Sequence, residues 1–122
     1  MANATSIIPF SASVKGLPIK ISATATPGTL IHTGSTSATL IDRYTLGLFN
    51  SDSVDRVATI EFGGVAAPDQ NIVITIPARS GITNVLGGHV LLGSGAVALT
   101  TRVFASAANV ITCIGWIMRV TP

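Results

Sequence analysis

The chain has 122 residues, of which 48% are hydrophobic and only 10% are charged, with a net charge of +2. This length indicates one domain with its own core, and the scattered basic residues, with few aromatic residues among them, exclude the clustered pattern of a nucleic-acid-binding surface. Charged residues usually make up about 25% of a soluble domain. Because the share in this chain is much lower, we expect partner subunits to cover part of its surface.

The first segment, residues 1–17, is small, polar and irregular, and it predicts an extended N-terminal arm. Ile7, Ile8 and Phe10 give this arm apolar side chains with which it can lie across a neighbouring chain. The segment has no basic start, and Pro9 interrupts its apolar run. We therefore expect neither a signal peptide nor a membrane helix.

From residue 18 onward, short segments typical of β-strands alternate with breaks that contain Gly, Pro, Asn or Asp. No segment keeps a helical period over three turns. We therefore predict that residues 18–122 form a single all-β domain, an antiparallel β-sandwich of jelly-roll or Greek-key type. The expected strand segments are 18–26, 29–33, 38–50, 55–64, 71–77, 82–86, 89–92, 96–106 and 109–120.

The last of these segments is apolar on both faces. One face carries Ile114, Trp116 and Met118, and the other carries Cys113 and Ile117 among its residues. The protein's own core can cover only one of them. Either the face with Trp116 fills the centre of an interface between subunits, or it fills the gap between two sheets while the other face lies under a loop. Cys113 is the only cysteine, so no intrachain disulfide is expected.

Few residues offer chemistry. Asp52 and Asp55 share a turn with Asn50 that could hold a cation, but the spacing of a calcium loop is missing, and turn formation explains these residues better. His32 and His89 lie in apolar segments without a third ligand at metal spacing. We expect no enzyme activity, no metal and no cofactor.

Two further charges interrupt apolar strands. Glu61 and Arg102 each lie in an otherwise apolar segment. We expect each to face solvent on an outer sheet surface or to be paired across an interface.

Two stretches resemble a known class of protein. DRVATIEFGGVAAPDQNIVITIPARSGI (55–82) and TRVFASAANVITCIGWIMRV (101–120) are similar in pattern to small structural proteins of tailed-bacteriophage virions, of the capsid decoration (cement) or head-fibre knob type. The resemblance covers roughly residues 18–120 and contains no catalytic motif. It implies a non-enzymatic module that is made in the host bacterial cytoplasm and placed on the capsid exterior. There a homo-oligomer, with a trimer favoured, would bind the major capsid protein or another virion protein and stabilise the shell.

This resemblance assigns a role to the arm and leaves alternatives open. Ile7, Ile8 and Phe10 would dock on the capsid, and deletion of residues 2–14 should abolish capsid binding while the fold stays intact. The first alternative is a receptor- or glycan-binding knob, for which Tyr44 and Trp116 are the aromatic candidates. The second is a metal-assisted enzyme that uses the acidic turn or the histidines.

Overall fold

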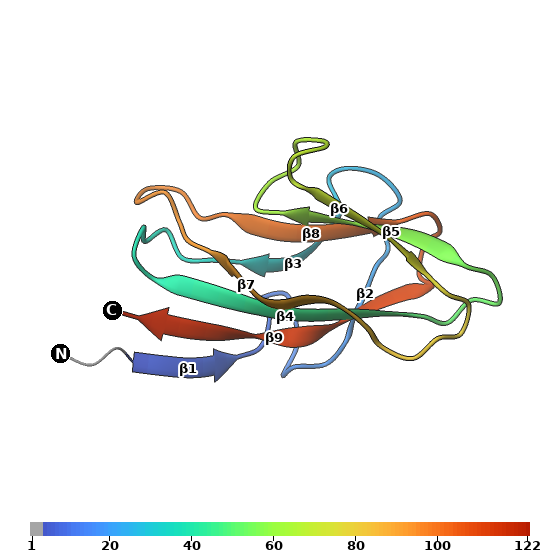
Figure 1. The fold of residues 1–122 in the computed structure, drawn as a ribbon, viewed down its shortest axis with the longest axis horizontal. Helices are drawn as coiled ribbons and strands as arrows, with labels where there is room; N and C mark the ends of the chain where they lie inside the picture. Colours follow the sequence, from blue (N-terminus) through green and yellow to red (C-terminus); the bar gives the residue numbers. More distant parts are fainter. Residues whose placement is uncertain (1–3) are drawn as a thin grey trace.

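The computed structural model describes residues 4–122, which form a sandwich of two antiparallel sheets without helices (Figure 1). Sheet I has the order β1-β9-β4-β7, and β2 also pairs with β9. Its strands are β1 (Ala4–Ile8), β2 (Ile19–Lys20), β4 (Ile41–Asn50), β7 (Thr83–Leu91) and β9 (Ile111–Thr121). Sheet II has the order β3-β8-β5-β6. Its strands are β3 (Thr29–Thr33), β5 (Arg56–Phe62), β6 (Asn71–Ile76) and β8 (Thr100–Ala105).

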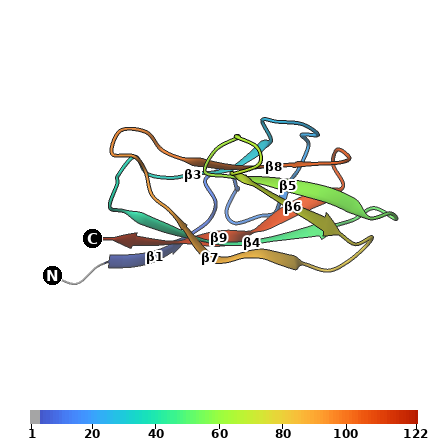
Figure 2. The same ribbon diagram turned by 45° about the horizontal axis from the view of Figure 1, so that its top comes forward.

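Most connections cross from one sheet to the other, as the two layers in Figure 2 show. Of the consecutive strands, only β5 and β6 pair directly as a hairpin. The predicted antiparallel β-sandwich is confirmed, and the alternation between sheets is compatible with the expected jelly-roll connection. Within the described residues, no helix is long and apolar enough to cross a membrane.

The core lies between the sheets and follows the two-residue period of the strands. Every residue of β4 pairs with β9, from Ile41 opposite Val120 to Asn50 opposite Ile111. Alternate residues of these strands therefore point inward. The buried apolar side chains are Phe10, Ile21, Ile31, Tyr44, Leu46, Leu48, Ala58, Ile60, Ile76, Leu86, Val103, Ala105, Ile111, Cys113 and Ile117.

The N-terminal residues belong to the sandwich. β1 pairs with β9 from Ala4 opposite Thr121 to Ile8 opposite Ile117, and Phe10 is a buried core residue. The arm of residues 1–17 was expected to extend from a domain of residues 18–122, but residues 4–10 lie in the sheet and the core. They do so because β1 completes the ladder of β9 and the Phe10 ring packs against other aromatic rings of the core. Residues 1–3 of the expected arm lie outside the described residues.

This placement corrects the expected effect of an N-terminal deletion. Removing residues 2–14 would take away strand β1 and the buried side chain of Phe10. Loss of a buried Phe side chain alone costs about 3–5 kcal/mol of stability. We therefore expect the deletion to destabilise the fold strongly instead of leaving it intact.

The expected strands 82–86 and 89–92 are one strand, β7. It passes through Gly87 and Gly88 with a shift of register opposite Tyr44 and Thr45. Gly88 has a φ of 95°, which glycine adopts easily, so the two glycines form a bulge where the sequence had indicated a break.

Candidate functional site

The outer face of sheet I is the first feature that stands out. Ile114, Trp116 and Met118 lie on this face of β9, while Cys113 and Ile117 on its other face are completely buried in the core. The idea that the face with Trp116 fills the gap between the sheets is therefore wrong. Trp116 is 45% exposed, and Gly16, from the segment between β1 and β2, lies at the edge of the same hollow. The contact of Trp116 with another subunit stays a prediction.

Cross-strand register extends this face across the sheet. Ile7 of β1 stands opposite Met118, Met118 opposite Arg43, and Arg43 opposite Val90 of β7. Side chains that are directly opposite in a sheet lie on the same side. Ile7 is 69% exposed and Val90 is 46% exposed. We call this surface, with Ile7, Val90, Ile114, Trp116 and Met118 as its apolar members, the outer face.

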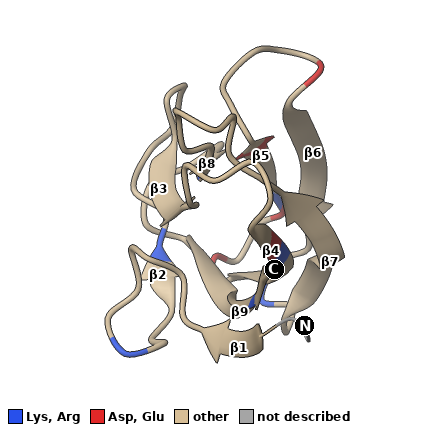
Figure 3. Cartoon of the chain, turned by 90° about the vertical axis from the view of Figure 1, so that its left-hand side faces the viewer, with Lys and Arg blue, Asp and Glu red and all other residues tan. Residues whose placement is uncertain are grey.

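Charge is sparse on the outer face. The strands of sheet I contain four Asp, Lys or Arg residues and no Glu, and two of them, Asp42 and Arg119, form an ion pair at 2.8 Å. The remaining two are Arg43 and Lys20 of β2, which stands opposite Thr112 on the same face as Trp116. Figure 3 shows the same scarcity, with charged residues as short separate segments on a mostly tan ribbon.

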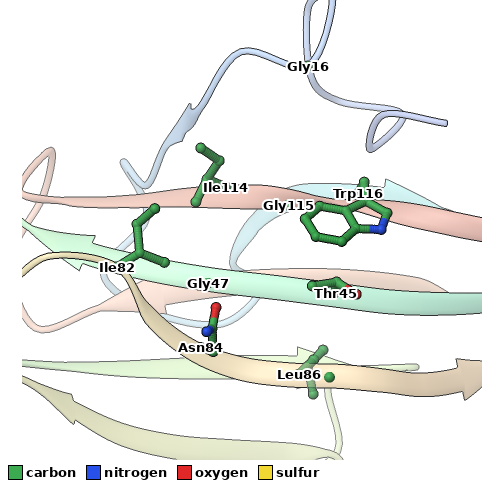
Figure 4. A pocket seen from close by; sticks show the side chains of 10 residues that line it. Gly16, Thr45, Gly47, Ile82, Asn84, Leu86, Ile114, Gly115 and Trp116 are labelled. Atoms are coloured by element: carbon green, nitrogen blue, oxygen red, sulfur yellow. The ribbon is translucent and has the colours of Figure 1, made fainter. Parts of the chain in front are cut away.

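A hollow of about 530 Å³ opens in the outer face. Its walls include Ile82, Ile114 and Trp116 (Figure 4), and glycines such as Gly47 form part of its floor. A second hollow of about 280 Å³ adjoins it at Trp116 and is lined by Arg43, among other residues. The indole therefore borders both depressions.

The glycine floor has a steric cause. A Cβ atom at Gly115 would overlap the backbone oxygen of Thr45 and come within 3.0 Å of the Phe10 ring. At Gly87, by contrast, a Cβ atom would meet no atom within 4 Å. Gly115 is thus required by the close approach of β4 and β9, while Gly87 faces the open space of the hollow.

The polar groups at the hollow suit non-covalent contact. The side chains of Thr45, Asn84 and Trp116 make no hydrogen bond to any other described residue, so they are free to bind a partner. Among the described residues, no acid, histidine or cysteine lines either hollow. The free polar groups beside an exposed tryptophan are suited to binding.

A second feature is a polar cluster buried between the sheets. His32 of β3 is 1% exposed, and its Nε2–H donates to Asp42 Oδ2 at 2.9 Å. Arg119 donates from Nε and Nη2 to the two oxygens of Asp42, at 2.8 and 2.9 Å. The cluster joins sheet II to two strands of sheet I.

Ser11, His32 and Asp42 are the residue types of a catalytic triad, but their hydrogen bonds are not those of a triad. The backbone N–H of Ser11, not its hydroxyl, donates to His32 Nδ1 at 3.0 Å. The Ser11 hydroxyl accepts from the Thr33 N–H at 2.7 Å. With the Nδ1 lone pair occupied, His32 cannot act as a base toward the serine. The cluster holds the segment after β1 in place.

The cluster predicts a dependence of stability on pH. Burial lowers the pKa of His32 below its ordinary value of 6.5, against the opposing hydrogen bond to Asp42. Its contribution to stability is therefore complete above pH 6.5 and declines as the pH falls toward the folded pKa, because the unfolded chain takes up the proton first. We expect the urea concentration at the midpoint of unfolding to decrease when the pH is lowered from 7 to 5.

Substitution of His32 tests whether this residue causes the pH dependence of stability. His32→Gln should be less stable than the wild type at pH 7 but should lose the decline between pH 7 and pH 5. Asp42 titrates lower, since burial opposes its ionisation but hydrogen bonds from Arg119 and His32 hold its pKa below 3.8. A wild-type midpoint that is flat over this interval would contradict the prediction.

The acidic turn forms as the turn interpretation predicted. The amide oxygen of Asn50 accepts from the Asp52 N–H at 2.9 Å, and Asp55 accepts from the Ala78 N–H at 2.9 Å. Asp52 also pairs with Arg56 at 2.7 Å. Among the described residues, no three His, Cys, Asp or Glu side chains lie together as metal ligands. His32 is in the core, and His89 on β7 accepts from the Gly87 N–H.

Two other expectations need correction. Glu61 does not face solvent, because the loop before β3 covers it. Its carboxylate accepts hydrogen bonds from Thr26 Oγ1 at 2.5 Å and from the Gly28 N–H at 2.6 Å. Arg102 donates to the Gly28 oxygen at 3.2 Å, so the two charged residues hold one loop within the chain.

Tyr44 is buried in the core, where burial raises the pKa of its hydroxyl to about 12. It therefore offers no surface for a glycan.

No family model, curated protein or solved structure matches the chain. Its function is therefore inferred from its own residues. Of the expected interface residues, Ile114, Trp116 and Met118 lie together on the outer face, whereas Phe10 of the expected docking residues lies in the core. The alternation of β9 pointed to Trp116, but no local signal could place Ile82 beside it, because that proximity depends on the pairing of β4 with β7.

Proposed function

We propose that this chain is a non-enzymatic structural protein of a tailed-phage virion, a capsid decoration protein that assembles as a homo-oligomer, with a trimer favoured. The outer face of sheet I is its assembly surface. The observation that carries this proposal is the exposure of large apolar side chains, among them Ile7, Val90 and Trp116, on one face of a sheet whose other face is the core. Exposed apolar patches of this kind mark interaction sites.

The energetics support an assembly role. Burial of apolar surface stabilises by about 25 cal/mol per Å², and association consumes part of this gain. A decoration protein repeats its contact many times on a shell, so a modest contact is sufficient in each copy. The resemblance of residues 55–82 and 101–120 to virion structural proteins supports the same role.

Of the three N-terminal residues expected to dock on the capsid, only Ile7 remains available for an intermolecular contact. Phe10 is in the core and Ile8 packs against it, so neither is free to dock on a shell. Ile7 remains exposed and lies beside Met118 on the outer face. We therefore assign Ile7 to the assembly surface as part of sheet I and not as part of a separate arm.

The proposal predicts specific, saturable binding to virions. Particles of the phage that encodes the chain are prepared with its gene deleted, incubated with the recombinant protein and pelleted. We expect the protein to pellet with the particles at a fixed stoichiometry and to raise the temperature at which they release DNA. Particles of an unrelated phage serve as control. Absence of the chain from wild-type virions by mass spectrometry, together with no pelleting, would refute the role.

A receptor- or glycan-binding knob is the second candidate, because the exposed indole of Trp116 has the free amide of Asn84 and the hydroxyl of Thr45 in the same hollow. Aromatic faces beside free polar groups are suited to sugars. In this case the hollow would stay open to solvent, the protein would stay monomeric, and the fluorescence of Trp116 would change on addition of a glycan.

A further inference from the structure

The outer face contains both a projection and a depression. Trp116 is 45% exposed and Ile82 is 56% exposed, and the hollow of about 530 Å³ lies between them. This volume is within the range of pockets that take a small ligand, so a large apolar side chain fits. A surface that carries both shapes can complement a second copy of itself.

We propose that a second copy of this chain covers the outer face, with Trp116 and the apolar residues near it entering the hollow of the neighbouring copy. The inference deepens the proposed function, on which it rests for the role of this face, by naming the partner that occupies it. The contact is made between copies, and the rest of the surface remains for the shell.

The size of the face fits such a contact. Four strands at about 4.8 Å spacing and about nine residues at 3.3 Å each give a flat footprint of roughly 600 Å². A stable interface buries about 800 Å² of accessible surface on each partner. Accessible surface exceeds a flat footprint because side chains project from it. The whole face is therefore of the size that a stable pair needs, whereas the hollow alone is much smaller.

The low charge of the outer face makes a second copy of the chain a better partner than a strongly charged molecule. Outside the inward ion pair, the strands of sheet I contain two residues of the types Asp, Glu, Lys and Arg, namely Arg43 and Lys20. Arg43 borders the smaller hollow, on the side of Trp116 away from Ile82, and Lys20 lies on the short strand β2, opposite Thr112. A contact centred on the larger hollow leaves both cations near its rim, where water screens them from the cations of the other copy. A strongly charged partner would find only these two cations to pair with.

The test compares two lysine substitutions. Ile82→Lys places a charge at the edge of the hollow, and Val73→Lys places one on β6 of the opposite sheet, where Val73 is 65% exposed. Both replace an exposed apolar residue, so both should fold, which circular dichroism and thermal unfolding verify. Mass is measured by light scattering on a sizing column over a concentration series. The fluorescence of Trp116, the only tryptophan, reports whether the face is covered.

We expect the wild type and Val73→Lys to be dimers or trimers with blue-shifted tryptophan emission. Ile82→Lys should dissociate at a concentration at least tenfold higher, with emission shifted to the red. A wild type that is monomeric at all concentrations would overturn the inference, as would an Ile82→Lys protein that associates like the wild type. A monomer that still pellets with virions would refute self-association alone, while an oligomer that binds no virion would refute the decoration role alone.

Discussion

Gly115→Ala is expected to destabilise the protein by at least about 3 kcal/mol, the upper end of what overpacking a well-packed core costs. The added methyl group would overlap the backbone oxygen of Thr45 and press on the Phe10 ring. Backbone atoms of a paired strand cannot rotate away, so β4 and β9 would have to separate along their ladder. Because domains of this kind are stable by only about 5–15 kcal/mol, the loss is a large fraction of the total.

Gly87→Ala is the matched control. It makes the same chemical change in the neighbouring region of the hollow, where a Cβ atom meets no atom within 4 Å. We expect its stability to differ from the wild type by less than about 1 kcal/mol. Urea unfolding, followed by circular dichroism and by tryptophan fluorescence, measures both. Equal stability of the two variants would show that β4 and β9 do not approach each other as closely as described.

Asp42→Asn is expected to cost about 3 kcal/mol. The substitution keeps the shape of the side chain but removes the charge that pairs with Arg119 and accepts from His32. Breaking a buried ion pair leaves the remaining charge without compensation, which is costly. The side chain of Asp42 is 2% exposed and that of Arg119 is 28% exposed, so the expected cost lies at the lower end for buried pairs.

Asp52→Asn provides the comparison for this substitution. Asp52 also pairs with an arginine, Arg56, but on the surface and within one turn. Exposed pairs of this type contribute little, so we expect almost no change in the urea midpoint. If Asp42→Asn were as mild as Asp52→Asn, the buried cluster would not be the connection between the two sheets that its hydrogen bonds indicate.

Local patterns were sufficient for the fold class and for several single residues. The alternation of β9 separated Trp116 from Cys113, and the turn chemistry of Asn50 and Asp52 was correct in its hydrogen bonds. These predictions succeeded because strand period and turn formation depend on residues near each other in sequence. The break expected at Gly87 failed because a bulge and a turn have the same residue signals.

Long-range pairing decided everything else. Phe10 was expected in an arm and is in the core, since β1 joins the edge of a strand more than 100 residues away. Glu61 was expected at the surface and is buried by a loop over 30 residues earlier in the chain. The burial of a side chain depends on which segments pack against it, and that is a property of the assembled sheets.

The printed sequence is enough to establish a β-rich chain with little charge, an apolar final strand, and a need for cover on more than one face, because composition and the two-residue period act locally. The tertiary structure alone decided which face remains open. It brought Ile82 and Trp116 to the two sides of one hollow through the ladders of β4 with β7 and β9. Those ladders are set by the packing of the two sheets on each other, which residues distant in sequence create together.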